Sequence, residues 1–463
     1  MVVSNKTLDN VFNTTPKPIS STEFDAVSEF MEELRGQGIE YLRFELPDLH
    51  GVSRLKVVPI NKVEGYASQG LNFYGGTLAL DTSSLVVPGS GYHEERKFKD
   101  HLLFPDFSTL TPVPWLEKTA KVICDPVDYS GEPLEIAPRY VLKGLLQQAS
   151  EIGFDVMMGH EFEFYLLNGE THEPLFGGCQ IFNHLRSQFN PDIDTMVRQL
   201  QESNIDIITY NCEHAPSQFE INYGPAIGMK AADKAFTFKN AVKEIAHRLG
   251  YLATFMTKPY PDKSGSCCHF HISLWDKGTD TNSFLDVKDE FGLSATVKSF
   301  IEGILTHARA VMPLIGPTPN CYRRLRPHTF APSKVSWGIE DRSSMIRVKA
   351  THDDRTHLEI RAASGLSNPY LTAAGILAAG LLGIKKQLAL RPTGDCPAEE
   401  NPDFPWLPQN LSEALDSLAA DVEIQQMLGE KFVQLFTKVK RFELDPFDRH
   451  VTEWERNEYM EVY

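Results

Sequence analysis

The 463-residue sequence has few cysteines, and none of them are spaced as a redox or zinc motif. The seven cysteines are odd in number and scattered, and no two form a CxxC pair. Disulfide-stapled proteins carry even sets of clustered cysteines, so this usage excludes a disulfide framework and indicates reduced thiols. We expect the adjacent residues Cys267 and Cys268 to be two packed thiols.

A basic block, a secretory signal and a membrane-spanning run are also missing. Lys and Arg number 45 against 62 Asp and Glu, which gives a net charge of −17 and argues against nucleic acid and anionic membranes as partners. Residues 1–15 lack the basic-then-apolar order of a signal peptide, which predicts a cytoplasmic protein. The apolar run after Asn368 is about 16 residues long, short of the roughly 20 that cross a bilayer, and predicts a buried core helix.

Glycine-rich phosphate loops are absent as well. The sequence has no Walker A motif and no GxGxxG segment after a strand. A phosphorylated ligand would therefore have to be held by metal ions and arginines.

The chain changes character along its length. Residues 1–24 are polar and turn-rich and predict a flexible tail. From about residue 38 to 125, β-prone segments alternate with Gly, Pro and Asp turns, which predicts a small sheet-rich unit. Pro138 is placed to open a helix that ends at Gly153.

The larger remainder mixes helical and strand-like patterns. Segments such as KAADKAFTFKNAVKEIAHRLG alternate with segments such as CCHFHISL, so we expect both helices and strands. At the C-terminal end, helical spacing is shown by Leu411, Leu415, Leu418 and Val422. This part of the chain predicts a helical tail piece.

The most informative stretch is VMMGHEFEFYLL, residues 156–167, where Glu161 and Glu163 interrupt an apolar segment. On a strand, side chains two residues apart share a face, so the two carboxylates would lie about 7 Å apart. In an apolar setting they repel each other unless a cation lies between them. A solvated strand face is the alternative interpretation of this pattern.

Other ligand-type side chains occur in similar settings. Glu213 and Glu220 bracket a turn, Glu359 lies in the strand-like HLEIR, and His269 and His271 share one face of CCHFHISL. A single histidine of this kind is more often a hydrogen-bonded core residue than a ligand. Together, acids and imidazole suggest divalent cations that bridge a polyphosphate, and oxygen-rich ligands suit Mg²⁺ or Mn²⁺ better than Zn²⁺. The arginines nearby in the sequence are Arg324, Arg342, Arg347 and Arg361.

Taken in order, these motifs resemble the class I glutamine synthetase family. The matching segments are HEFEF, EHAPSQFE, KPYPDKSGSCCHFHISL, NCYRRLRPHTFAP, DRSSMIR and HLEIRAASGLSNPYL, with DLHG near the N-terminus. The resemblance starts at about residue 25 and covers nearly the whole chain beyond it. It implies an α+β fold, with a β-grasp domain at residues 25–130 and a catalytic domain at residues 131–463. The latter would be an open antiparallel β-barrel flanked by helices.

The resemblance also implies an activity and an assembly. Family members activate glutamate with ATP to γ-glutamyl phosphate, and ammonia then displaces the phosphate. They form homo-oligomers, dodecamers of two hexameric rings, with each active site between subunits. Asp48 of DLHG would belong to the loop that reaches the neighbouring site.

Site roles are implied residue by residue. The metal ligands would be Glu163, Glu213 and Glu220 for one Mg²⁺ or Mn²⁺, and Glu161, His269 and Glu359 for the other. The ATP contacts would be His271, Ser273, Arg342 and Arg347. The contacts to glutamate and the transferred phosphoryl group would be Arg324 and Arg361, with Ser264 and Gly265 in the substrate segment.

Four positions depart from the family pattern. The flap glutamate, which takes the proton from the incoming ammonium, falls on Phe330, and a phenyl ring cannot accept a proton. A substrate asparagine falls on Ser264, a glycine on Cys267 and a phosphoryl-binding arginine on His357. These losses favour a non-catalytic structural or chaperone-like oligomer. It would be similar to the lens-associated member of the family, which is regarded as lacking synthetase activity and is implied to organise intermediate filaments.

Two alternatives stay open. The intact metal set favours an ATP- and Mg²⁺-dependent γ-glutamyl ligase that acts on ammonia or another amine. A nucleotide- or metal-binding sensor without turnover is the third hypothesis.

Overall fold

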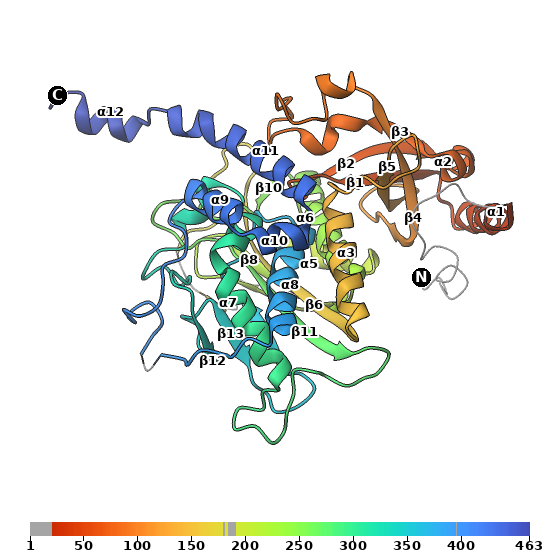
Figure 1. The fold of residues 1–463 in the computed structure, drawn as a ribbon. Helices are drawn as coiled ribbons and strands as arrows, with labels where there is room; N and C mark the ends of the chain where they lie inside the picture. Colours follow the sequence, from red (N-terminus) through yellow and green to blue (C-terminus); the bar gives the residue numbers. More distant parts are fainter. Residues whose placement is uncertain (1–20, 179–180, 184–190, 395) are drawn as a thin grey trace.

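The computed structural model describes residues 21–178, 181–183, 191–394 and 396–463, which form two β-sheets with helices around them (Figure 1). The small sheet, with two helices beside it, lies at one end of the molecule, and the C-terminal helices extend away from the body. The mixed helix and strand content predicted from the sequence is confirmed.

The first helix, α1 (Ser21–Gly36), begins inside the predicted tail of residues 1–24, so the tail prediction is wrong for residues 21–24. The rest of that tail, residues 1–20, lies outside the described residues. Within α1, buried apolar side chains recur at helical spacing: Val27, Phe30, Met31 and Leu34. This stripe packs the helix onto the core and overrides the polar character of the sequence before it.

The small sheet has the strand order β2-β1-β5-β4-β3. Its strands are β1 (Tyr41–Pro47), β2 (Ser53–Pro59), β3 (Leu71–Tyr74), β4 (Asp100–Pro112) and β5 (Thr119–Val127). The β1–β5 pair is parallel and the other pairs are antiparallel. Helix α2 (Val63–Gln69) precedes β3. These strands lie where the sequence predicted a sheet-rich unit, while the domain boundaries of 25–130 and 131–463 stay predictions.

The large sheet has nine strands in the order β12-β13-β14-β11-β6-β8-β7, with β9 and β10 also paired to β6. Its strands are β6 (Phe154–Asn168), β7 (Ile207–Cys212), β8 (Gln218–Tyr223), β9 (Ala226–Ile227), β10 (Tyr251–Thr254), β11 (Cys268–Asp276), β12 (Trp337–Ile339), β13 (Ile346–Lys349) and β14 (His357–Ile360). All pairs are antiparallel except β12–β13 at the edge. The expectation of an antiparallel sheet is therefore correct apart from that edge pair.

Helices lie around the large sheet, and the last of them lead away from the body (Figure 1). They are α3 (Pro138–Glu151), α5 (Pro191–Glu202), α6 (Met229–Arg248), α7 (Ala295–Ile315), α8 (Pro369–Lys386), α9 (Leu411–Ala420), α10 (Val422–Leu428), α11 (Glu430–Arg449) and α12 (Glu453–Tyr459). Helix α3 starts at the predicted Pro138, and Gly153 adopts a positive φ of 92° just beyond its end.

Helix α8 is the predicted core helix after Asn368. The Asn368 side chain accepts hydrogen bonds from the backbone N–H groups of Tyr370 and Leu371, which caps the helix. Its residues are buried almost throughout. None of the described helices combines the length and apolar character that a bilayer crossing requires.

The C-terminal helical prediction is confirmed, because all four of its apolar positions lie in helices. Leu411, Leu415 and Leu418 are buried on α9. The helix stops at Asp421, whose side chain accepts a hydrogen bond from the Ile424 N–H and so starts a new helix, α10. Val422 then begins α10 and is 59% exposed, so it does not continue the buried stripe of α9.

A buried ion cluster ties the small sheet to the helices of the large one. Arg139 of α3 donates to both carboxylate oxygens of Asp125 on β5, at 2.9 and 2.8 Å, and to Asp106 on β4 at 2.7 Å. It also donates to Asp233 of α6, at 2.9 and 2.8 Å. Lys143 adds a second cation 2.6 Å from Asp125. The guanidinium thus bonds carboxylates from two strands of the small sheet and from a helix beside the large sheet.

Removing this guanidinium tests the cluster. We expect Arg139→Met to lower the free energy of unfolding by about 3–5 kcal/mol, because buried carboxylates lose their counter-charge. Denaturant titration followed by circular dichroism measures the loss. The matched control is Arg355→Met, which breaks the exposed pair with Asp353 and should change stability by less than about 0.5 kcal/mol. Equal effects of the two variants would contradict the assignment.

Candidate active site

Strand β6 presents the two glutamates on one face and phenyl rings on the other. Phe162 and Phe164 are fully buried, while Glu161 and Glu163 are only partly buried. The alternation confirms the strand geometry predicted from the sequence, since successive side chains point to opposite faces.

Strand register extends this face across the sheet. The side chains that face each other on neighbouring strands are His269 and Glu161, Glu220 and Glu163, His271 and Glu359, and Arg347 and Glu359. We call this row, together with Glu213, the acidic face. Glu213 lies directly after β7 and not on the strand itself. Residues from five sequence motifs are thereby brought to one surface.

Two imidazoles contact Glu161. His269 Nδ1 lies 2.7 Å from Glu161 Oε1, and His271 Nε2 lies 3.5 Å from Glu161 Oε2. Burial alone would raise the pKa of Glu161, but the hydrogen bonds from these two rings outweigh it and hold the pKa well below its usual range. Glu161 is therefore an ionised carboxylate.

Glu163 is oriented by neutral donors. The backbone N–H of Cys267 and the side-chain amide of Gln218 each donate to its Oε2 at 3.1 Å. The same amide lies 3.1 Å from the carbonyl of Gly265. Within the described part of the chain, no side-chain cation forms a hydrogen bond or ion pair with Glu163.

Glu213 and Glu220 carry the repulsion that the sequence predicted. Burial, and next the charge of Glu163, raise the pKa of Glu213 to about 7. Burial and the charges of Glu161 and Glu163 raise the pKa of Glu220 to about 10. Carboxylates this hard to ionise indicate a site with excess negative charge, which fits a bound divalent cation.

Cysteine enters this face unexpectedly. Ligand-type atoms of Glu163, Cys267 and His269 all lie within 4.8 Å of one another. The sequence had assigned Glu163 and His269 to different cations and had not considered Cys267 as a ligand. Cys267 is 3% exposed, and burial followed by the charge of Glu163 raises the pKa of its thiol. The six described cysteines are free thiols.

Two of the predicted arginines engage the acidic face. Arg347 donates to Glu359 at 3.0 Å and to Glu340 at 2.5 Å, and Arg361 also donates to Glu359. Arg361 Nε donates to the backbone carbonyl of Arg342 at 3.0 Å. Burial would raise the pKa of Glu359, but His269 and the arginine charge hold it low. The side chain of Arg342 is exposed.

Arg324 lies beneath the substrate segment. One of its terminal nitrogens donates to the carbonyls of residues 361–363 at 2.9–3.3 Å, and its Nε has no hydrogen-bond partner. Burial lowers the pKa of this guanidinium. A Cβ on Gly265 would lie 2.8 Å from Arg324 Cδ and 2.7 Å from the Thr257 carbonyl, so only glycine fits there.

His357 stands in place of the expected arginine and contacts a predicted ATP ligand. Its Nε2 lies 3.1 Å from His271 Nδ1, and its Nδ1 lies 2.6 Å from the Arg355 carbonyl. Burial and the nearby His271 lower the pKa of His357. A neutral imidazole supplies less positive charge than the arginine it replaces. The hydroxyl of Ser273 accepts a hydrogen bond from the Trp275 indole at 3.0 Å.

The flap position is apolar and exposed. Phe330 is 82% exposed, and its ring centroid lies 5.8 Å from that of His214. His214 Nδ1 lies 3.1 Å from the hydroxyl of Ser264, whose carbonyl accepts a 2.6 Å hydrogen bond from Tyr165. Two departures from the family pattern thus meet at one histidine that the sequence analysis missed. Its place inside EHAPSQFE, directly after Glu213, is the signal that could have revealed it.

Asp48 is engaged within its own loop. Its carboxylate accepts hydrogen bonds from the N–H groups of His50 and Val52 at 2.8 and 2.9 Å and from Arg54 Nε at 2.8 Å. Its carbonyl accepts a 2.9 Å hydrogen bond from Asn368. The expected reach to a neighbouring subunit therefore stays a prediction.

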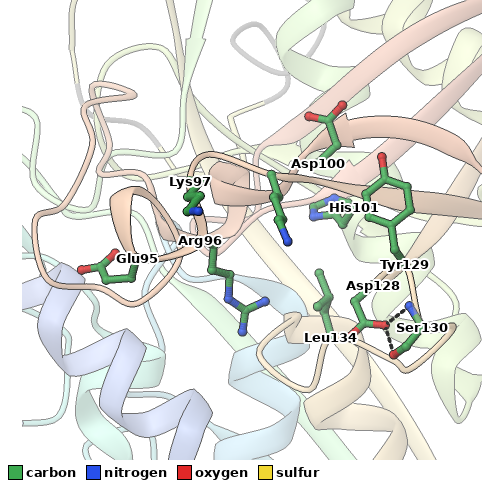
Figure 2. A pocket seen from close by; sticks show the side chains of 11 residues that line it. Glu95, Arg96, Lys97, Asp100, His101, Asp128, Tyr129, Ser130 and Leu134 are labelled. Carbon is green, nitrogen blue, oxygen red and sulfur yellow. Dashed lines mark hydrogen bonds between the residues drawn. The ribbon is translucent and has the colours of Figure 1, made fainter.

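A separate cavity of about 460 Å³ lies at the small sheet and shares no residue with the acidic face (Figure 2). Its walls include three cationic side chains, Arg96, Lys97 and Lys99, and three acidic ones, Glu95, Asp100 and Asp128. Because the two signs of charge are mixed, the lining does not favour one class of ligand.

A curled sheet with helices outside and an acidic, arginine-bearing face places the chain among the α+β proteins. The chain belongs to the glutamine synthetase family: the sequence family described as "Glutamine synthetase, catalytic domain" matches residues 135–459. Glutamine synthetase of Methanocaldococcus jannaschii is 34% identical over 457 residues, covering 94% of this chain and 98% of the relative.

A solved structure and the lens relative complete the comparison. The structure titled "GmaS/ADP complex-Conformation 1" is 31% identical with a TM-score of 0.83, covering 93% of this chain and 99% of that chain. Lengsin of Canis lupus familiaris is 29% identical over 471 residues, covering 98% of this chain and 79% of lengsin. Glutamine synthetases and GmaS match as well or better, so the expected special kinship with the lens relative is not supported.

The raised carboxylate pKa values predict how stability depends on pH. Folding raises the pKa of Glu213 and Glu220 above the ordinary value of 4.5, so the folded state binds protons more tightly and loses stability as the pH rises. Metal-free protein should therefore melt at a lower temperature at about pH 8 than at about pH 6. Mg²⁺ or Mn²⁺ should reduce this difference, because a bound cation stabilises the ionised forms.

Differential scanning fluorimetry with chelator and with metal measures both effects. Glu220→Gln should flatten the pH dependence and weaken the stabilisation by metal, whereas Glu202→Gln, at an exposed position on α5, should change neither. If metal stabilised Glu220→Gln as much as the unmodified protein, this assignment of the acidic face would be wrong.

Proposed function

We propose that this chain is an ATP- and divalent-cation-dependent γ-glutamyl ligase of the glutamine synthetase type. The observation that carries the proposal is the acidic face, on which all six predicted ligand residues occur on or directly beside adjacent strands of one sheet. Buried, mutually repelling carboxylates cost stability, so their accumulation at one place favours a functional role over a structural one.

In this proposal one Mg²⁺ or Mn²⁺ is held by Glu163, Glu213 and Glu220, and the other by Glu161, His269 and Glu359. The donor set fits these ions, because it is rich in oxygen and contains carboxylates that repel each other in the absence of a cation. When bound, such ions neutralise the charge of the transferred phosphate. The chain itself orients its ligands: Gln218 and the Cys267 N–H hold Glu163.

The nucleotide would lie beside His271, Ser273, Arg342 and Arg347, and the glutamate and phosphoryl group beside Arg324 and Arg361. The similar GmaS structure is titled as an ADP complex, which supports nucleotide binding at this fold. Arg361 bonds Glu359 and could compensate phosphate charge from there. Gly265 lets the Arg324 side chain pack close to the backbone of the proposed substrate segment.

The acceptor would be an amine with an apolar substituent. Phe330 exposes its ring at the position where the family carries the flap glutamate. An alkyl or aryl amine that covered this exposed ring would remove apolar surface from water, which is favourable. His214, in contact with Phe330, offers an imidazole that can accept the amine proton in place of the missing carboxylate.

Family members are oligomeric, and we propose a ring assembly of this chain as well. A dodecamer of two hexameric rings would allow Asp48 to act at a neighbouring site, as the resemblance implies. Intermediate-filament partners have no support among the described residues or the comparisons, and we do not propose them.

The second candidate is a non-catalytic oligomer on the same scaffold. It is favoured by Phe330, Ser264 and His357, which remove a flap acid, a substrate amide and a guanidinium. The comparisons support the ligase better, because the named relatives of equal or higher identity are glutamine synthetases.

Phosphate release decides between the two. With ATP, Mg²⁺, glutamate and a panel of ammonia, methylamine, longer alkylamines and aromatic amines, we expect phosphate release to rise at least about tenfold, a barrier difference of roughly 1.4 kcal/mol, over the amine-free rate for an apolar amine. Mass spectrometry of the γ-glutamylamide confirms the product. Release that no amine stimulates, in protein shown by calorimetry to bind ATP, would favour the non-catalytic oligomer.

A variant pair tests the acceptor site. His214→Asn should lower the rate with the best amine by about 10²–10⁴-fold, because a positioned base is lost. The nucleotide affinity should stay unchanged. His247→Asn, at the end of α6, is the control.

Restoring the flap acid tests the choice of amine. Phe330→Glu should shift preference from the apolar amine towards ammonia, since a carboxylate attracts ammonium and no longer packs on an alkyl or aryl group. The ratio of kcat/KM for the two acceptors measures the shift. An unchanged ratio would show that Phe330 does not line the acceptor site.

A further inference from the structure

The strand that begins at Cys268 is preceded by a buried thiol that faces the same way as His269. Cys267 and His269 lie two residues apart and both approach Glu163, while Cys268 between them packs into the apolar core. Alternation along the strand therefore separates one thiol that is directed at the acidic face from one that is not.

The three donors form a mixed set. Glu163 offers a carboxylate oxygen, Cys267 a sulfur and His269 an imidazole nitrogen, and all lie within 4.8 Å of one another. A tetrahedral Zn²⁺ with bond lengths of about 2.0–2.3 Å holds its ligand atoms roughly 3.5 Å apart. Side-chain movements of the order of 1 Å would bring the three atoms to that spacing.

The surroundings orient these donors as the outer contacts of metal ligands do. His269 Nδ1 is hydrogen-bonded to the carboxylate of Glu161 at 2.7 Å, the arrangement that fixes the ring of a zinc-bound histidine. Glu163 is held by Gln218 and by the N–H of Cys267 through one oxygen, Oε2. The ligands thus need little reordering when a cation arrives.

We propose that Glu163, Cys267 and His269 form a binding site for a single thiophilic cation such as Zn²⁺ or Co²⁺. A sulfur ligand shifts preference away from Mg²⁺ and Mn²⁺, which favour oxygen, and towards Zn²⁺ and its neighbours. The fourth position is left for water or a further acid of the face.

The site overlaps both cation positions of the proposed ligase. In the proposed ligase, Glu163 and His269 would bind different Mg²⁺ or Mn²⁺ ions. One Zn²⁺ bound by Glu163, Cys267 and His269 would therefore exclude both of these ions. We therefore expect Zn²⁺ to displace Mg²⁺ and to act as an inhibitor if the chain is a ligase. The binding itself does not depend on turnover, so its test can fail or succeed separately from the proposed function.

Cobalt spectroscopy reads the sulfur ligand directly. Full-length protein, stripped of metal with a chelator and kept reduced, is titrated with Co²⁺ alone. We expect a near-ultraviolet charge-transfer band from thiolate to Co²⁺ that saturates at one ion per chain and disappears when Zn²⁺ is added. Excess Mg²⁺ should not remove it.

Two variants remove the sulfur, and two controls keep it. Cys267→Ser and Cys267→Gly should both lose the band and bind Zn²⁺ at least about tenfold more weakly by competition, a change of roughly 1.4 kcal/mol. Either variant suffices if the other folds poorly by circular dichroism. Cys268→Ala, the neighbouring core thiol, and Cys396→Ala, an exposed thiol, should keep the band.

The outcomes are distinct. Absence of the band in the unmodified protein overturns the proposal, as does a band that persists in both Cys267 variants or vanishes in either control. Loss of the band confined to the Cys267 variants establishes the site, whether or not any amine supports phosphate release.

Discussion

The structure depends on the repulsion among carboxylates that antiparallel pairing brings together on one sheet face. Glu161 escapes it by bonding two imidazoles, and Glu359 by bonding two arginines. Glu213 and Glu220 have no such partner among the described residues, and their pKa values are raised. The face is thus divided into a compensated half and a half that still lacks positive charge, and a divalent cation is the natural complement of the latter.

The departures from the family pattern at the predicted site positions contact two histidines. Ser264 and Phe330 both contact His214, and His357 contacts His271. Cys267 lies between the predicted substrate segment and the predicted metal ligands, and its backbone N–H donates to Glu163.

Local sequence patterns predicted several elements well. The alternation around Glu161 and Glu163 predicted β6, and Pro138 with Gly153 predicted the bounds of α3. The apolar run after Asn368 predicted α8. Each of these signals is contained within a dozen or so residues, where side-chain periodicity reports directly which face is buried. The start of α1 at Ser21 and the helix break before Val422 were missed, because a helix start and a helix break are decided by single caps and by packing partners elsewhere.

The sequence by itself determined which residue types were available: the strand-borne acids, the two alternate-position histidines, the ordered family motifs and the phenylalanine in place of a flap acid. Only the tertiary structure decided which side chains contact each other. It packed His214 against Phe330 and directed the Arg324 guanidinium towards backbone carbonyls. It also placed the sulfur of Cys267 beside Glu163 and His269. The physical reason is that strand register and loop packing are non-local, so a spacing along the chain fixes a side chain's face but not its neighbour across the sheet.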